Sequence, residues 1–197
     1  METTQTSNTT NTSLQPLTRP IVQGGVLETT RDCGTCKECC GGWLWGEAHG
    51  IPFFPNHPCH YLDPTPGRCG GCTIYEDRPP ICRDFQCLWL QDLQMPGWMK
   101  PEFSKVIMYQ RTYEDIEGDV HEPGWSITWI SMVECGETVD PTVLNWIITQ
   151  ARTQEFNLHY QVKKTDYYMG SPEFQDFART YGLQSKTTVV VHEDAHA

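Results

Sequence analysis

Cysteine thiols dominate the side chains of this chain that could do chemistry. Nine of the ten cysteines lie between Cys33 and Cys87, and four of them open that stretch in the pattern CxxCxxCC. Two intervening residues let the backbone turn tightly enough to aim both sulfur atoms at one point. Lone cysteines are usually small buried hydrophobic residues, which does not account for so dense a cluster. The spacing therefore predicts a metal-binding protein.

The identity of the metal stays open between zinc and iron. Cys33, Cys36 and Cys39 match the first three ligands of bacterial ferredoxin sequences, which favours an iron–sulfur cluster (4Fe-4S). The segment Cys69-Gly-Gly-Cys72 is more typical of a zinc knuckle, where paired CxxC motifs make a tetrahedral site. We expect an iron–sulfur cluster or zinc, with a slight preference for the cluster.

The cysteine pattern resembles that of the YkgJ-type cysteine-cluster family, whose members are described as zinc- or iron-chelating proteins. The resemblance covers roughly residues 30–90 and combines CxxCxxCC, a later single cysteine, and CxIYxxRPxxCRxFxC. The same cysteine pattern occurs in flagellin lysine methylases, which are longer chains. The matching positions are Cys33, Cys36, Cys39, Cys40, Cys59, Cys72, Ile74, Tyr75, Arg78, Pro79, Cys82, Arg83, Phe85 and Cys87.

The resemblance implies eight metal ligands, enough for two four-thiolate sites or for one cluster with unused thiols. Cys82 and Cys87 are about 140° apart on an ideal helix, so they converge on one metal only if that helix distorts or ends. Otherwise they serve different sites. The predicted ligands are Cys33, Cys36, Cys39, Cys40, Cys59, Cys72, Cys82 and Cys87, with Cys69 and His60 as further candidates and Cys135 outside the pattern.

Composition and sequence patterns limit the cellular compartment and the kinds of partner that we expect for this protein. The chain shows neither a secretory signal nor a membrane-spanning run, so we expect a cytoplasmic protein whose thiols bind metal rather than form disulfides. A formal net charge of -11 argues against nucleic acid as the main partner. Because ten is an even number, all the cysteines could in principle pair as disulfides. The adjacent Cys39 and Cys40, however, could bridge each other only with strain.

The elements around the cysteines suggest an α+β fold in three parts. Residues 1–22 form a polar low-complexity tail, 23–98 a loop-rich, metal-stabilised cysteine domain, and 99–197 a domain with a small antiparallel sheet and two helices. In the last part, alternation predicts a hairpin of strands 105–113 and 125–133, joined through an acidic turn at 114–119. Further strands are expected at 158–162 and 187–192.

Two helix starts are marked by a capping residue followed by proline. These are Asp140-Pro141 and Ser171-Pro172, and each precedes apolar residues at helical spacing. Pro79 and Pro80 fit the first turn of a shorter helix. No dinucleotide, phosphate-loop, zincin or nucleophile-elbow motif is present, so enzyme function has no support beyond the metal centre.

Three functions follow as expectations. The first is a metal-binding protein that holds an iron–sulfur cluster or zinc through the cysteine cluster. The second is a metal-stapled structural or interaction component of a larger assembly, such as a viral particle, with a protein partner that orders the polar tail. The third is an accessory or catalytic role in protein modification, implied only by the methylase resemblance.

Overall fold

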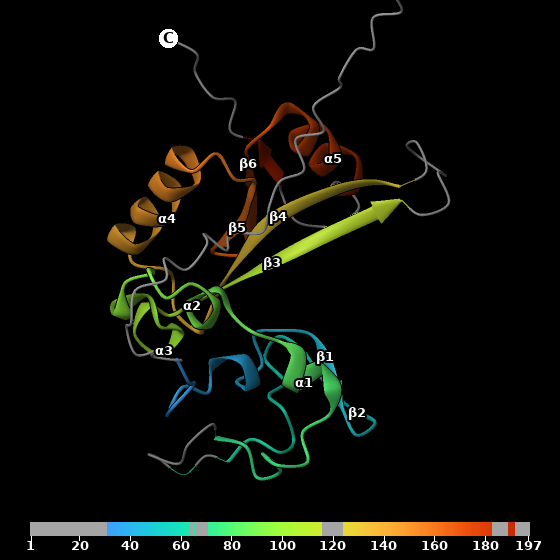
Figure 1. Cartoon of the computed structure of the whole chain (residues 1–197), viewed down its shortest axis with the longest axis vertical. Coiled ribbons are helices and arrows are strands. Elements are labelled where there is room, and N and C mark those ends of the chain that lie inside the picture. Colours follow the sequence, from blue (N-terminus) through green and yellow to red (C-terminus); the bar gives the residue numbers. More distant parts are fainter. Residues whose placement is uncertain (1–30, 64, 66–70, 116–123, 183–188, 192–197) are drawn as a thin grey trace, which may run out of the picture.

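The computed structural model describes residues 31–63, 65, 71–115, 124–182 and 189–191. Its class is α+β, as predicted, with a five-stranded sheet in the order β3-β4-β5-β6-β7 and a separate two-stranded sheet, β1-β2. The cysteine-rich segments gather at one end of the large sheet, below the point where β3 begins (Figure 1). The polar tail and residues 23–30 lie outside the described residues.

The predicted hairpin is confirmed. Strand β3 (Val106–Asp115) pairs antiparallel with β4 (Trp125–Glu134), and Val106 lies opposite Glu134 at one end of the ladder. Of the expected acidic turn, Glu114 and Asp115 belong to β3, and residues 116–119 lie outside the described part of the chain.

Helix α4 (Pro141–Thr153) begins where the sequence predicts it. The Asp140 carboxylate accepts a hydrogen bond from the backbone N–H of Thr142 at 2.7 Å, and Pro141 occupies the first turn. The helix leads into β5 (Leu158–Val162), also as predicted, which runs parallel to β4.

Strand β6 (Thr165–Met169) was not predicted. It pairs antiparallel with β5 through a tight turn in which Lys163 and Lys164 have φ of 50° and 66°. Glycine or asparagine usually marks such a turn, because lysine rarely adopts positive φ. Two lysines there give no turn signal, so the second half of this hairpin cannot be read from the sequence.

Helix α5 (Pro172–Gly182) confirms the second predicted helix, and the Ser171 hydroxyl accepts the Phe174 N–H at 3.2 Å. Strand β7 (Val189–Val191) follows and runs parallel to β6. It confirms the centre of the last predicted strand, while residues 187, 188 and 192 lie outside the described residues.

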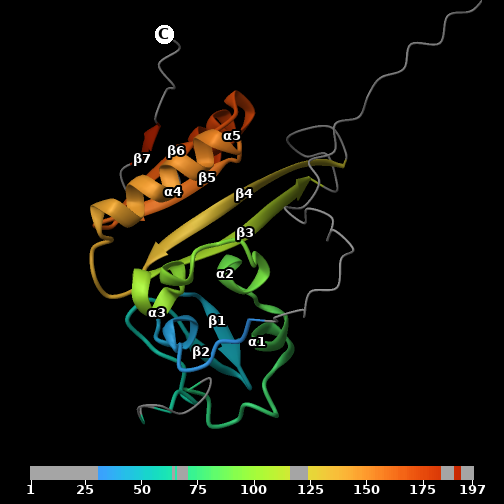
Figure 2. The same ribbon diagram turned by 60° about the vertical axis from the view of Figure 1, so that its left-hand side comes forward.

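The two longer helices cover opposite faces of the sheet (Figure 2). Ile147 of α4 packs in one core with Met132 and Leu158, whereas Phe174 of α5 packs on Trp129 at 5.8 Å between ring centroids. Helices α4 and α5 each connect parallel neighbouring strands, but β6 and β7 run opposite to β4 and β5. Connections of one hand then put the helices on opposite faces. The sheet is accordingly mixed, with both antiparallel and parallel pairs.

The cysteine-rich part is loop-rich, as predicted. Its regular elements are all short: η1 (Glu38–Cys40), β1 (Gly46–Ala48), β2 (Ile51–Phe53), α1 (Pro80–Asp84), α2 (Leu88–Gln91), η3 (Gly97–Met99) and α3 (Pro101–Ser104). Pro80 lies in the first turn of α1, as expected, and α1 ends before Phe85.

Arg31 ties the beginning of the described chain to the segment after α2. Its guanidinium lies over the Trp89 ring at 4.6 Å and donates to the Trp89 carbonyl at 2.7 Å. It also donates to the carbonyls of Asp92, Leu93 and Met95 at 2.9, 2.8 and 2.6 Å.

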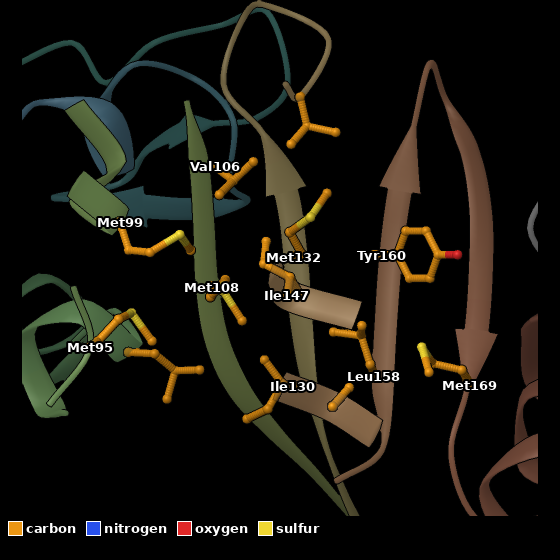
Figure 3. Packing of buried hydrophobic residues seen from close by; sticks show 13 residues of the cluster. Met95, Met99, Val106, Met108, Ile130, Met132, Ile147, Leu158, Tyr160 and Met169 are labelled. Atoms are coloured by element: carbon orange, nitrogen blue, oxygen red, sulfur yellow. The ribbon is translucent and has the colours of Figure 1, made fainter. Parts of the chain in front are cut away.

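Most of the buried apolar surface belongs to the sheet rather than to the cysteine-rich loops. The α4 face of the sheet carries a methionine-rich core, with Met132, Met99 and Met108 almost fully buried (Figure 3). A smaller cluster lies at the cysteine-rich end and consists of Cys87, Ile107 and Cys135, with Trp43 among the side chains packed against it. Among the described helices, none combines the length and apolar character needed to cross a bilayer.

Candidate metal centre

The CxxCxxCC segment forms a turn followed by the helical turn η1. The Cys36 N–H donates to the Cys33 carbonyl at 2.9 Å, and Gly34 between them has a φ of +51°, which glycine adopts readily. Cys39 and Cys40 are the last two residues of η1. All four side chains are half-buried.

Side chains near the start of β3 hold this segment in place. The Glu38 carboxylate pairs with the Lys105 ammonium at 3.1 Å and accepts the Trp43 indole N–H at 3.1 Å. The hydrogen bond to Glu38 raises the pKa of Lys105. Just upstream, the Thr35 hydroxyl donates to Glu102 of α3 at 2.7 Å. The cysteines are thus anchored to the edge of the folded sheet.

One set of thiols, close enough for their charges to interact, lies where η1 is anchored to the start of β3. Burial, followed by the thiolates of Cys87, Cys40, Cys36 and Cys33, raises the pKa of Cys39. Burial also raises the pKa of Cys87, to which the thiolates of Cys33 and Cys36 add. We call Cys33, Cys36, Cys39 and Cys87 the first cysteine group.

Backbone N–H groups point at two sulfur atoms of the first group. Cys36 accepts hydrogen bonds from the N–H groups of Glu38 and Glu102, and Cys87 accepts them from the N–H groups of Leu90 and Trp89. Each of these bonds lowers the pKa of its thiol, although burial has the larger effect and both pKa values remain raised. Such N–H···S bonds also stabilise thiolates that bind metals.

A second set of thiols interacts around Cys40. Burial raises the pKa of Cys40 to about 12, and the thiolates of Cys59, Cys72 and Cys82 contribute after it. Burial likewise raises the pKa of Cys82, with Cys59 and Cys72 as the next causes. We call Cys40, Cys59, Cys72 and Cys82 the second cysteine group.

Backbone hydrogen bonds, and not only interactions between thiolate charges, hold three members of the second group near one another. The Cys59 N–H donates to the Cys40 carbonyl at 3.0 Å, and the Leu62 N–H closes a turn onto the Cys59 carbonyl at 3.0 Å. Leu62 also forms an isolated antiparallel bridge with Cys72. Gly42 makes the approach possible, since a Cβ there would lie 2.8 Å from the backbone nitrogen of Pro58.

Two basic residues close to the thiols act in different ways. Arg78 lowers the pKa of Cys82 by its charge, and its guanidinium lies over the Tyr75 ring at 3.7 Å. Lys37 instead donates to the backbone carbonyls of Asp63 and Thr65, at 2.6 Å each, and so fastens the loop after Cys59. Arg78 is therefore a charge partner, whereas Lys37 is a tether.

The residues fit a thiolate centre by type, burial and grouping, but their sulfur atoms are not drawn together around one ion. Within the described residues, no three His, Cys, Asp or Glu side chains converge closely enough to hold a metal ion. Ligand sulfurs around a tetrahedral zinc, with Zn–S near 2.3 Å, lie only about 3.8 Å apart. Across those same residues no disulfide joins any of the nine cysteines.

The further candidates fare differently from the eight predicted ligands. Cys69 lies outside the described residues. His60 is exposed and packs edge-on against Tyr61, at 5.2 Å between ring centroids. Sequence reasoning gave Cys135 no role, yet it is buried beside Cys87 in the small apolar cluster. Only its position in the fold reveals this, because it is 48 residues from Cys87 in the chain.

Comparisons with known proteins add no relative: no protein-family model matches the chain, and neither a curated protein nor a solved structure matches it significantly. The resemblance to the YkgJ-type family therefore stays a prediction that depends on the cysteine pattern.

Proposed function

We propose that this protein binds a metal centre through its cysteine thiolates, either an iron–sulfur cluster or zinc. The observation that carries the proposal is the gathering of eight thiols from separate segments of the chain, where the ionised forms repel one another. A bound cation removes that repulsion, because thiolates are its natural ligands.

An iron–sulfur cluster is the favoured occupant. Each thiolate of such a cluster binds its own iron, so the ligand sulfurs do not have to meet at a single ion. The thiols of this chain lie within electrostatic range of one another without converging at one point. Backbone N–H groups directed at sulfur, as on Cys36 and Cys87, are a recognised means of tuning such clusters.

Anaerobic purification tests the proposal directly. Iron, acid-labile sulfide and zinc are measured per chain, together with the visible spectrum and the electron paramagnetic resonance spectrum after reduction. A brown protein with iron and sulfide in equal amounts supports the cluster. A colourless protein with stoichiometric zinc rules out the cluster but retains the metal centre. Protein that contains no metal, and takes up none when reconstituted, contradicts the proposal.

The cytoplasm is the compartment we propose, because thiolate centres persist where thiols are kept reduced. A second candidate function, a metal-stapled interaction component of a larger assembly, is favoured by exposed apolar side chains. Trp45 is 76% exposed and Phe103 is 65% exposed, and aromatic residues are enriched at protein interfaces. Replacing both with serine, followed by light scattering and co-purification with tagged wild type, tests whether these residues support association.

A further inference from the structure

The outer edge of strand β3 carries backbone hydrogen-bonding groups that no other strand of the described chain takes up. β3 is the first strand of the five-stranded sheet, and among the described strands it pairs only with β4. The two form an uninterrupted antiparallel ladder over all ten residues of β3. In such a ladder every second residue directs its N–H and C=O away from its neighbour.

Hydrogen bonds at both ends of the ladder show which residues face β4. The Cys135 N–H donates to the Lys105 carbonyl at 2.8 Å, just before β3 begins. At the other end, the Gly124 N–H donates to the Asp115 carbonyl at 2.9 Å. Odd-numbered residues therefore face β4. The residues with outward N–H and C=O groups are Val106, Met108, Gln110, Thr112 and Glu114.

The far half of this edge is open. Met108 is buried, whereas Gln110, Thr112 and Glu114 are exposed. The strand extends past α2 and α3, which lie beside its beginning (Figure 1). Within the described part of the chain, no hydrogen bond engages the outward backbone groups of these three exposed residues.

The open edge lacks the features that commonly keep edge strands from pairing. Proline, bulges and clustered lysines usually shield such strands. Residues 109–114 read Tyr-Gln-Arg-Thr-Tyr-Glu, without proline, glycine or lysine, and the register with β4 contains no bulge. Tyrosine and threonine favour strands, so this segment is a ready template for an added strand.

The residue types along the edge fit a second copy of the same strand. An antiparallel pair centred on Thr112 sets Gln110 opposite Glu114 of the partner subunit, so that an amide meets a carboxylate. It also sets Arg111 opposite the partner's Tyr113, so that a guanidinium meets a ring. The two threonine hydroxyls meet at the two-fold axis, and no like charges lie directly opposite each other.

Neighbouring registers fit less well. Moving the centre of the pair to Arg111 sets two guanidinium groups opposite each other, which destabilises a sheet. That register also uses the outward groups of Met108, which is buried. Moving the centre to Tyr113 pairs Gln110 with residue 116, beyond the end of β3.

We propose that two copies of this chain associate through their β3 edges, in an antiparallel pair centred on Thr112, so that their sheets become continuous. The inference goes beyond the metal-binding function and does not depend on it. Each copy carries a formal net charge of -11, so the copies repel each other at long range. Association should therefore strengthen as salt is added.

Sedimentation velocity over a range of protein concentrations tests the proposal with a matched pair of variants. Thr112→Lys places two ammonium groups opposite each other at the axis and should abolish the dimer. Thr128→Lys is the control, because Thr128 lies directly across from Thr112 on β4 and their hydroxyls share a hydrogen bond of 2.9 Å. The control loses the same bond without altering the edge, and it should dimerise like the wild type.

A charge exchange separates an interface from damage to the fold. Thr112→Glu alone should also be monomeric, but a mixture of Thr112→Lys and Thr112→Glu should form a mixed dimer. Gln110→Lys sets an ammonium opposite the partner's Glu114 and should tighten the wild-type dimer, by up to about fivefold for each such pair. This variant keeps the test decisive if the threonine variants unfold, which circular dichroism detects.

The outcomes distinguish this inference from the proposed function. Wild-type protein that stays monomeric at every concentration overturns it, even if the β3 edge then captures an extended peptide. A dimer that persists in Thr112→Lys, or that Gln110→Lys leaves unchanged, assigns association to another surface and also overturns it. Metal content is measured in the same samples, and its absence contradicts the metal centre without bearing on the dimer.

Discussion

At the scale of single residues, the protonation of the thiols would control uptake of the proposed metal. Burial raises the pKa of Cys36, Cys82 and Cys87 above that of an ordinary thiol, and it raises the pKa of Cys40 to about 12. These groups are therefore protonated near neutral pH in the metal-free protein. A metal ion binds thiolates, so each must lose its proton on binding.

Metal binding should accordingly release protons and strengthen as the pH rises. We expect nearly one proton for each bound thiol when zinc is added to the reduced, metal-free chain at pH 7.5. The apparent affinity should increase steadily from pH 6.5 to 8.5, because a raised pKa leaves protons to be displaced throughout that range. Zinc titration in weakly buffered solution with a pH indicator measures the release.

The matched control for proton release is Cys135→Ser. Burial also raises the pKa of Cys135, but this thiol is not a predicted ligand, so its removal should leave the number of released protons unchanged. An affinity that does not vary between pH 6.5 and 8.5 would mean that the bound groups are already ionised, against expectation.

Residue types and spacing in the sequence were enough to select the candidate thiols, but not to divide them. The division depends on contacts such as that between Cys40 and Cys59, which are 19 residues apart, and on the path of the chain after α1. Neither leaves a periodic signal. The anchoring of η1 through Glu38 and Lys105 was likewise invisible, since both residues look like ordinary surface charges in the sequence.

At the scale of elements, the Arg31 guanidinium holds α2 and the segment that follows it by four backbone carbonyls, that of Trp89 within α2 and those of Asp92, Leu93 and Met95 after it. Arg31→Ala leaves those carbonyls without their donor and removes the contact with Trp89. We expect the free energy of unfolding to fall by about 1.5–3 kcal/mol, the range for hydrogen bonds to a charged group. Urea denaturation followed by tryptophan fluorescence measures the change.

Arg31→Lys is the informative companion to that variant. Lysine keeps the charge but cannot reach four carbonyls with a planar fork, so it should restore only part of the lost stability. Full restoration would show that charge alone matters at this position.

The N-terminal cap of α4 gives a second prediction at this scale. Asp140→Ala removes the acceptor of the Thr142 N–H and should lower the free energy of unfolding by about 1 kcal/mol. Asp140→Asn retains a capping oxygen and should cost only a small part of that. Equal losses in the two variants, measured by thermal unfolding, would contradict a capping role.

Elements with strong local signals were predictable, and those set by tertiary context were not. Capping residues and apolar spacing marked α4 and α5, and alternation marked β3 and β4. Strand β6 was missed because its turn uses Lys163 and Lys164, and the three-residue strands β1 and β2 are too short to show alternation.

At the scale of the whole molecule, the two halves should respond unequally to metal removal. The sheet has its own methionine-rich core, whereas the cysteine-rich loops have only short elements and a small apolar cluster. Structural metal contributes on the order of 10–16 kcal/mol in small thiolate domains, comparable to the whole stability of many proteins. The loops should therefore depend on the proposed metal far more than the sheet does.

Hydrogen exchange with and without a chelator measures that difference. We expect amide exchange to accelerate at least tenfold in residues 33–87 after chelation, while β4 and β5 change little. The Cys36 and Leu62 amides, which donate within the cysteine-rich part, should be among those affected. Equal acceleration in the sheet would show that metal and core form a single cooperative unit.

The adjacency of Cys39 and Cys40 has a consequence for any attempt to engineer this protein. The two residues are joined by one planar peptide in η1, so a rotation that reorients one thiol also moves the other. A design that changes the surroundings of one thiol must therefore preserve the direction of the other, and inserting even one residue between the two cysteines should disrupt both cysteine groups.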